Sequence, residues 1–238
     1  MGESRKERWA RERAETLVYE RALWARGLLH VAGIDEVGVG PLAGPVVAAA
    51  VVLPQEIAID GVRDSKKVAP RRRSVLAEAI RAEAVAFSLG VVEPAEVDRL
   101  NPYQASMEAM RLAVTGLAIE PDHLLVDART VPGVDTEQTA IVGGDAQVYS
   151  IAAASIVAKV HRDGIMATLD TRYPGYGFAR NAGYGTAEHM RALESLGPCP
   201  AHRRSFAPVR RALAREAGYD TLEVTEGNGD ARDAGETQ

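Results

Sequence analysis

Residues 31–53 read VAGIDEVGVGPLAGPVVAAAVVL, and this stretch decides the fold. An apolar run ends in the adjacent carboxylates Asp35 and Glu36, a glycine-rich turn follows at once, and a second apolar run comes after the turn. Two short apolar runs joined by a turn predict a β-hairpin. In this interpretation Ile34 points into the core, so the two acids lie at or just beyond the strand end, where one or both face solvent and each other.

Two like charges this close together repel each other unless a cation lies between them. Gly38 and Gly40 in the turn allow a backbone or a polyanion to approach closely, because glycine has no side chain. Asp35 and Glu36 therefore indicate a hard divalent metal beside a phosphate. A polar strand end with a surface salt bridge is the simpler alternative.

The composition is that of one ordinary globular domain. The chain has 238 residues, of which 46% are hydrophobic and 26% are charged. The single cysteine, Cys199, excludes an internal disulfide and a cysteine-based zinc cluster, and a free thiol fits a reducing compartment. The longest apolar run, 46–53, is too short to cross a bilayer, and the charged N-terminus is unlike a signal peptide. We expect a soluble, cytoplasmic protein.

The net charge of -5 is located in the C-terminal tail. Residues 219–238 contain six acids and one base, which leaves 27 bases against 27 acids in the rest of the chain. The tail has few large apolar side chains, so we expect it to be disordered. The preceding chain is interpreted as a charged helix within 1–27 and one folded domain over 28–218 that ends in helices. Its basic clusters leave a nucleic-acid partner open despite the acidic pI.

The hydrophobic pattern predicts an α/β protein with a mixed β-sheet of about five strands flanked by helices. Two paired strands come first, and the later strands alternate with helices. Pro70 suits the first position of a helix, and Asn101 followed by Pro102 is a strong helix start. Strands are predicted over 29–35, 44–53, 85–92, 122–127 and 138–142, and helices over 4–26, 70–83, 102–117 and 150–171.

Two further acids extend the carboxylate pair. Asp127 ends the predicted strand 122–127, and Asp145 lies in a Gly-Gly-Asp loop before the long helix. Because the carboxyl ends of neighbouring parallel strands converge, Asp127 can meet Asp35 and Glu36. Four oxygen donors without nearby His or Cys ligands suit Mg²⁺ or Mn²⁺, and two such ions promote in-line displacement at phosphorus. Taken alone, Asp127 and Asp145 are equally compatible with a polar strand end and ordinary turn chemistry.

Several long motifs at coherent spacing closely resemble type 2 ribonuclease H, that is, bacterial ribonuclease HII. The resemblance covers roughly residues 15–212 in consistent order. The matching segments are AGIDE at 32–36, GVGPLAGPVVAAAV at 38–51, RDSKK at 63–67, SIAAASIVAKV at 150–160 with Arg162 and Asp163, and GYGT at 183–186.

The resemblance implies a ribonuclease H-like fold with a C-terminal helical extension. It also implies endonucleolytic cleavage of RNA in RNA–DNA hybrids and of single ribonucleotides embedded in duplex DNA, leaving 5′-phosphate and 3′-hydroxyl ends. The family's four catalytic and metal-binding acids fall on Asp35, Glu36, Asp127 and Asp145, which implies Mn²⁺ or Mg²⁺, two per site with substrate bound. We further expect a monomer, no membrane partner, and a role in DNA replication and repair.

A nuclease that cuts only beside ribose must sense the 2′-hydroxyl group. By the resemblance, the backbone of the turn Gly38-Val39-Gly40 and the hydroxyl of Tyr184 are the sensors, with the tyrosine ring stacked on the sugar. Without the resemblance, Tyr184 reads as a semi-buried aromatic residue. The remaining substrate-binding residues implied by the resemblance are Ser65, Lys66 and Lys67.

Three positions depart from the family pattern. Val39 stands where arginine is expected, and Gln147 and Ala182 stand where basic residues are common. Backbone contacts from the two glycines survive such a change, but a bidentate guanidinium contact to phosphate does not. We therefore expect weaker substrate binding and an altered junction preference rather than altered chemistry.

Other polar residues have simpler interpretations. Asp163 is a helix charge paired with Arg162 or Lys159. Ser155 lacks the sequence context of a hydrolase nucleophile, and the five histidines show no metal-ligand spacing and are expected at the surface. Basic runs that indicate either solvated helix faces or phosphate contacts comprise Lys66, Lys67, Arg71, Arg72, Arg73, His202, Arg203, Arg204, Arg210 and Arg211.

Two other functions remain open at this stage. The first is a different metal nuclease of the same fold group that acts on DNA, such as a resolvase, since acidic ligands alone do not separate the two. The second is a hybrid-binding protein with impaired catalysis, which the valine at position 39 makes more credible.

Overall fold

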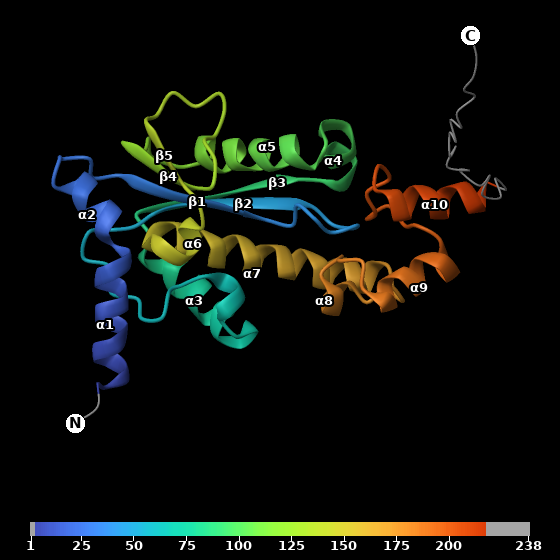
Figure 1. Cartoon of the computed structure of the whole chain (residues 1–238), viewed down its shortest axis with the longest axis horizontal. Helices are drawn as coiled ribbons and strands as arrows, with labels where there is room; N and C mark the ends of the chain where they lie inside the picture. The colour runs from blue at the N-terminus through green and yellow to red at the C-terminus, as the bar shows by residue number, and fades with distance from the viewer. Residues whose placement is uncertain (1–2, 218–238) are drawn as a thin grey trace, which may run out of the picture.

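The computed structural model describes residues 3–217, which form a five-stranded mixed sheet with helices on both faces (Figure 1). The strand order is β3-β2-β1-β4-β5. β2 pairs antiparallel with β1 and β3, and β4 pairs parallel with β1 and β5. The predicted mixed sheet and its opening hairpin are therefore confirmed. The strands are β1 (Val31–Val37), β2 (Val46–Val52), β3 (Ala86–Val92), β4 (His123–Asp127) and β5 (Gln138–Ile141).

The long helices begin where local signals place them. Pro70 is the first residue of one helix, and the Asn101 side chain accepts a hydrogen bond from the Gln104 amide at the start of another. The helices are α1 (Arg5–Thr16), α2 (Val18–Trp24), α3 (Pro70–Glu83), α4 (Pro94–Leu100), α5 (Pro102–Thr115), α6 (Gly144–Gln147), α7 (Tyr149–Arg172), α8 (Phe178–Asn181), α9 (Ala187–Leu196) and α10 (Ala207–Glu216), with a 3-10 turn η1 (Ser65–Lys67).

Helices α5 and α7 cover opposite faces of the sheet, with α3 beside α7 (Figure 1). Successive residues of β2 alternate between the two cores, because side chains along a strand point to opposite faces. Both helices approach the sheet at glycines. A Cβ at Gly33 would overlap the backbone of Ser150 in α7, and a Cβ at Gly90 would overlap the backbone of Ala109 in α5. These contacts fix the height of each helix above the strands.

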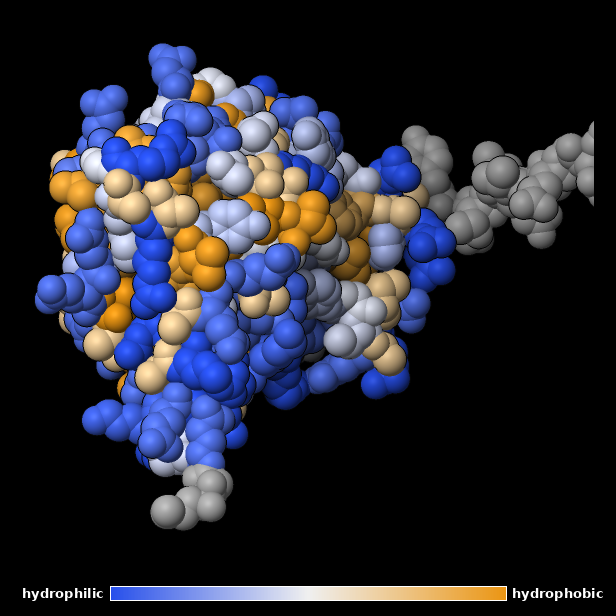
Figure 2. All heavy atoms as spheres, turned by 60° about the vertical axis from the view of Figure 1, so that its left-hand side comes forward, coloured by the Kyte–Doolittle hydropathy of each residue, from blue (hydrophilic) through white to orange (hydrophobic). Residues whose placement is uncertain are grey.

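The two ends of the described chain lie at opposite ends of the sheet (Figure 1). The predicted N-terminal helix is interrupted at Leu17, so α1 and α2 are separate, and α1 buries no side chain. Figure 2 shows hydrophilic side chains covering the molecule next to the N-terminal end. Residues 219–238, the predicted disordered tail, lie outside the described residues. No helix within residues 3–217 is long and apolar enough to cross a membrane.

Candidate active site

The two adjacent acids lie within β1 rather than beyond its end. The strand continues to Val37, which pairs with Val47 of β2. Asp35 therefore points to the α7 face, where it meets Ser155, and Glu36 points to the α5 face, where it meets Ser106. The expectations that the two acids lie at or beyond the strand end and that they face each other are wrong, because the strand includes both and consecutive strand residues point to opposite sides. Asp35 is 6% exposed.

Asp127 lies at the end of β4, beside the acids of β1. The parallel register pairs Val126 with Ile34, so Asp127 follows next to Asp35. One oxygen of Asp127, Oδ1, accepts a hydrogen bond of 2.7 Å from the amide of Gly144, at the start of α6. The same short helix carries Asp145. The predicted convergence of strand ends thus brings Asp127 to the acids of β1.

Burial and like charge raise the pKa values of three of these acids. The pKa of Asp35 is raised first by burial and then by Glu36 and Asp127. The pKa of Glu36 is raised by burial and by Asp127. The pKa of Asp145 is raised by burial and by the charges of Asp64 and Asp127. Asp127 is therefore the neighbour that the other three acids share.

The donor chemistry of this cluster fits a hard divalent cation, since all four side chains offer carboxylate oxygens. A buried oxygen of Glu36, Oε2, has no hydrogen-bond partner within residues 3–217, and such an atom is costly to leave unpaired. In the same part of the chain, however, no three His, Cys, Asp or Glu side chains are arranged to enclose one ion.

The glycine turn and the tyrosine predicted to read ribose lie together. A Cβ at Gly40 would lie 3.9 Å from Cε1 of Tyr184, so the edge of the ring lies beside the glycine. Tyr184 is 48% exposed and available to a ligand. Gly38 has φ +91°, and a Cβ there would overlap the guanidinium of Arg162. Glycine is thus required at position 38 for two independent reasons.

The three positions that depart from the family pattern have structural roles. Val39 is half-buried and packs against the apolar core beneath α5. The Ala182 carbonyl accepts a hydrogen bond from Arg162, and the Gln147 side chain donates to the carbonyls of Val142 and Gly143. None of the three brings a side-chain cation to the site.

The 3-10 turn η1 borders the acids. Ser65 is buried, and its hydroxyl oxygen accepts a hydrogen bond of 2.9 Å from Ser155, so its side chain is directed inward. Lys66 and Lys67 are exposed, and the charges of Asp64 and Lys66 act on Asp145. Of the predicted substrate-binding residues in this turn, the two lysines are accessible and the serine is not.

Several residues expected at the surface are buried, and their sequence pattern did not indicate it. Arg73, Arg162 and Arg203 are 8%, 0% and 0% exposed. Arg73 pairs with Asp163 at 3.2 Å, and Asp163 also pairs with Lys159 but not with Arg162. The predicted pairing with Lys159 is therefore confirmed, and the one with Arg162 is wrong. These arginines sit in charged runs typical of solvated helix faces, so only tertiary contacts identify them.

Three of the five histidines are also buried, contrary to expectation. His189 and His202 face each other with Nε2 atoms 3.0 Å apart, and His123 is 2% exposed. Nδ1 of His189 lies 2.9 Å from the Tyr184 carbonyl, and the Cys199 amide donates to Nδ1 of His202. If His189 carries its proton on Nδ1 and His202 on Nε2, every bond has one donor and one acceptor. The pair therefore supports the Tyr184 turn from inside.

Known proteins resemble this chain over most of its length. The sequence model of the family described as Ribonuclease HII matches residues 32–209. A ribonuclease HII of Myxococcus xanthus is 54% identical over 85% of this chain and 69% of its own length, and one of Moorella thermoacetica is 54% identical over 82% and 96%. The crystal structure of ribonuclease H2 from Pyrococcus horikoshii superposes with a TM-score of 0.67 at 27% identity, covering 78% of this chain and 97% of that one.

Fold and similarity define a nuclease of the ribonuclease H-like class. A structure of Bst-RNase HIII in complex with Mn²⁺, 23% identical with a TM-score of 0.56 over 82% of this chain and 73% of that one, shares the same fold. Within that class the chain belongs to the ribonuclease HII family. It is accordingly a hydrolase that acts as a ribonuclease H.

Proposed function

We propose that this enzyme cleaves the RNA strand of RNA–DNA hybrids and single ribonucleotides embedded in duplex DNA, leaving 5′-phosphate and 3′-hydroxyl ends. The observation that carries the proposal is the position of Tyr184 beside Gly40, on a chain in which three acids, Asp35, Glu36 and Asp145, gather around a fourth, Asp127. A ribose sensor is useful only to an enzyme that must find a 2′-hydroxyl, since that group alone separates RNA from DNA.

In this proposal Asp35, Glu36, Asp127 and Asp145 hold Mn²⁺ or Mg²⁺. When bound, such ions activate a water and stabilise the leaving oxygen of an in-line displacement. The Gly144 amide holds Asp127 through its Oδ1. A cation among these acids also relieves the repulsion that raises their pKa values.

The substrate contacts follow from accessibility. The exposed Tyr184 ring stacks on the sugar, and its hydroxyl contacts the 2′-oxygen. Backbone amides of the turn from Gly38 to Gly40 bind the ribose 2′-oxygen and the adjoining scissile phosphate, and Lys66 and Lys67 contact phosphates beside it. We further propose that the enzyme acts as a cytoplasmic monomer in DNA replication and repair.

Cleavage of matched duplexes tests this function. One duplex carries a single ribonucleotide in an end-labelled strand, and its control has deoxyribose at that position. We expect cleavage of the first alone, in Mn²⁺ or Mg²⁺ and not in a chelator, with a 3′-hydroxyl that a polymerase extends. Cleavage of both duplexes identifies a general DNA nuclease instead. Hybrid binding without any product identifies a binding protein with impaired catalysis.

A further inference from the structure

Two fully buried arginines make hydrogen bonds only to backbone carbonyls within the described residues. Arg162 comes from α7, and Arg203 comes from the loop before α10. Arg162 donates to Pro45 at 2.9 Å, Ala182 at 2.9 Å and Ala43 at 3.2 Å, while Arg203 donates to Gly44 at 2.8 and 3.0 Å, Val39 at 2.7 Å and Gly38 at 2.5 Å.

These carbonyls belong to two turns that are far apart in sequence. One is the glycine turn of 38–45, and the other is the turn of 181–184 that carries Tyr184. Arg162 bonds to both, and main-chain bonds join them again, with the Leu42 amide donating to Gly183 at 2.9 Å. The two arginines therefore set the position of the glycine amides relative to the tyrosine ring.

Arg203 also polarises two backbone amides through the carbonyls to which it donates. Its bonds reach the carbonyls of Gly38 and Val39. Each carbonyl shares a peptide group with the next amide, so these bonds withdraw electron density from the N–H groups of Val39 and Gly40. Hydrogen bonds in series strengthen one another in a low-dielectric interior. The guanidinium of Arg203 therefore makes the amides of Val39 and Gly40, which belong to the turn proposed to bind phosphate, better hydrogen-bond donors.

The two guanidiniums place positive charge beside the glycine turn without a hydrogen-bonded carboxylate to balance it. Burial lowers the pKa of both, and the charge of Arg162 lowers that of Arg203 further, to about 9. Arginine is basic enough that both stay protonated at neutral pH. The charged or titratable groups acting on them are Asp98, Asp163 and Tyr184, and none of the three accepts a hydrogen bond from either arginine.

We propose that Arg162 and Arg203 are positioning residues for ribose recognition, and that their buried charges supply at this turn the positive potential that the side chain of Val39 lacks. The proposal rests on the proposed function, because it assigns phosphate and ribose to the turns that these arginines join. Neither arginine contacts the substrate. Each acts through the backbone that it holds.

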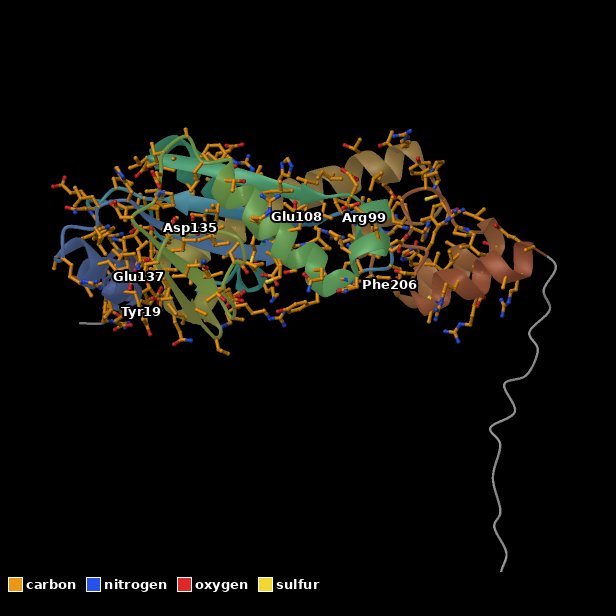
Figure 3. The ribbon with its side chains drawn as sticks, turned by 90° about the horizontal axis from the view of Figure 1, so that it is seen from above. Tyr19, Arg99, Glu108, Asp135, Glu137 and Phe206 are labelled. Carbon is orange, nitrogen blue, oxygen red and sulfur yellow. The ribbon has the colours of Figure 1, made fainter. Side chains whose placement is uncertain are left out.

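Conservative replacement separates geometry from charge. Arg203→Lys and Arg162→Lys keep the charge and lose the planar guanidinium with its several N–H donors, whereas Arg203→Gln loses the charge as well. The readout is the dissociation constant for the all-DNA duplex divided by that for the single-ribonucleotide duplex, both measured by fluorescence anisotropy. All variants carry Asp127→Asn, so that the duplex is not cut. Arg111→Lys, in a half-exposed pair with Glu108 on α5 (Figure 3), is the matched control.

We expect each lysine variant to reduce this ratio about tenfold, corresponding to the loss of about one hydrogen bond. Arg203→Gln should in addition lower the slope of log affinity against log salt, by less than the value of about one that the loss of a direct phosphate contact produces, because Arg203 acts through the backbone. The control should change neither quantity. A purely structural role lowers the active fraction for both duplexes alike, so an unchanged ratio in folded lysine variants overturns the proposal.

A milder variant serves if the arginine variants do not fold. The Arg203 guanidinium lies 5.5 Å from the centroid of the Phe206 ring, which Figure 3 places at the start of the C-terminal helices. Phe206→Leu loosens this contact and keeps all charges, and we expect the ratio to fall about threefold, in line with a weak cation–π contact. An unchanged ratio in folded Phe206→Leu counts against the proposal. If the parent itself does not distinguish the two duplexes, the proposed function fails and not the arginine assignment.

Discussion

Asp127 is the acid that the other three share as a neighbour, so neutralising it tests the whole cluster. Asp127→Asn removes one charge and keeps an oxygen that can accept the Gly144 amide, whereas Asp127→Ala removes both. We expect Asp127→Asn to lower kcat by about 10²–10³-fold, since a metal contributes several kcal/mol to charge stabilisation. In a chelator, the same variant should be more stable than the wild type.

The size of that stabilisation follows from the strand geometry. Asp127 ends β4 and lies next to Asp35 of β1, and neighbouring parallel strands are about 4.8 Å apart. At that distance and an effective dielectric constant of about 20, two unit charges repel by about 3 kcal/mol. Solvent screening at the half-exposed Asp127 reduces this to about 1–2 kcal/mol. For a chain of this length the melting temperature should rise by about 2–8 °C.

The pH dependence of the stability without metal has a defined sign. Asp35, Glu36 and Asp145 have raised pKa values in the folded protein. The folded state keeps these protons to a higher pH than the unfolded chain does, so stability without metal is lost as the pH rises through the folded-state values. The gain from Asp127→Asn should therefore be larger at about pH 8 than at about pH 5.

Thermal melting in EDTA and single-turnover cleavage in Mn²⁺ measure the two effects. Asp135→Asn, an exposed loop acid that Figure 3 places at the other end of the molecule from Phe206, is the matched control and should change neither. Asp127→Ala should gain less stability than Asp127→Asn, because it leaves the Gly144 amide unpaired. Near-normal turnover in Asp127→Asn, or a melting temperature at or below that of the wild type in EDTA, refutes the reasoning.

Three further changes test the surroundings of the cluster. Tyr184→Phe should weaken binding of a single-ribonucleotide duplex about tenfold and leave all-DNA binding unchanged, through the loss of about one hydrogen bond; equal effects on both duplexes in anisotropy contradict this. Val39→Arg should lower KM on a DNA–RNA–DNA duplex by adding a phosphate contact, and an unchanged KM at several salt concentrations counts against it. Burial and then His189 lower the pKa of His202 to about 4, so the unfolded chain binds the proton first and stability falls as the pH drops from about 6.5. Urea unfolding of His202→Asn should show a flatter pH dependence over that window; an identical slope excludes His202 as its source.

The strand and helix pattern is readable from the sequence because its signals are local. Alternating apolar residues, Pro70 and the Asn101-Pro102 start act within a few residues of where they stand, so the predicted elements lie close to the observed ones. The break at Leu17 was missed because helical periodicity continues across it. The order of the strands in the sheet depends on contacts between distant segments and appears only in the fold.

The candidate site, too, could be predicted from the sequence only in part. The sequence alone determined which residue types are present: four acids at strand ends and loops, a glycine turn and a tyrosine in a family motif. Only the tertiary structure decided that Asp35 and Glu36 point to opposite faces, because the strand extends three residues further than its apolar run. It alone decided that Arg162 and Arg203 are buried against the glycine turn, since their partners are backbone carbonyls, and carbonyls are the same in every sequence.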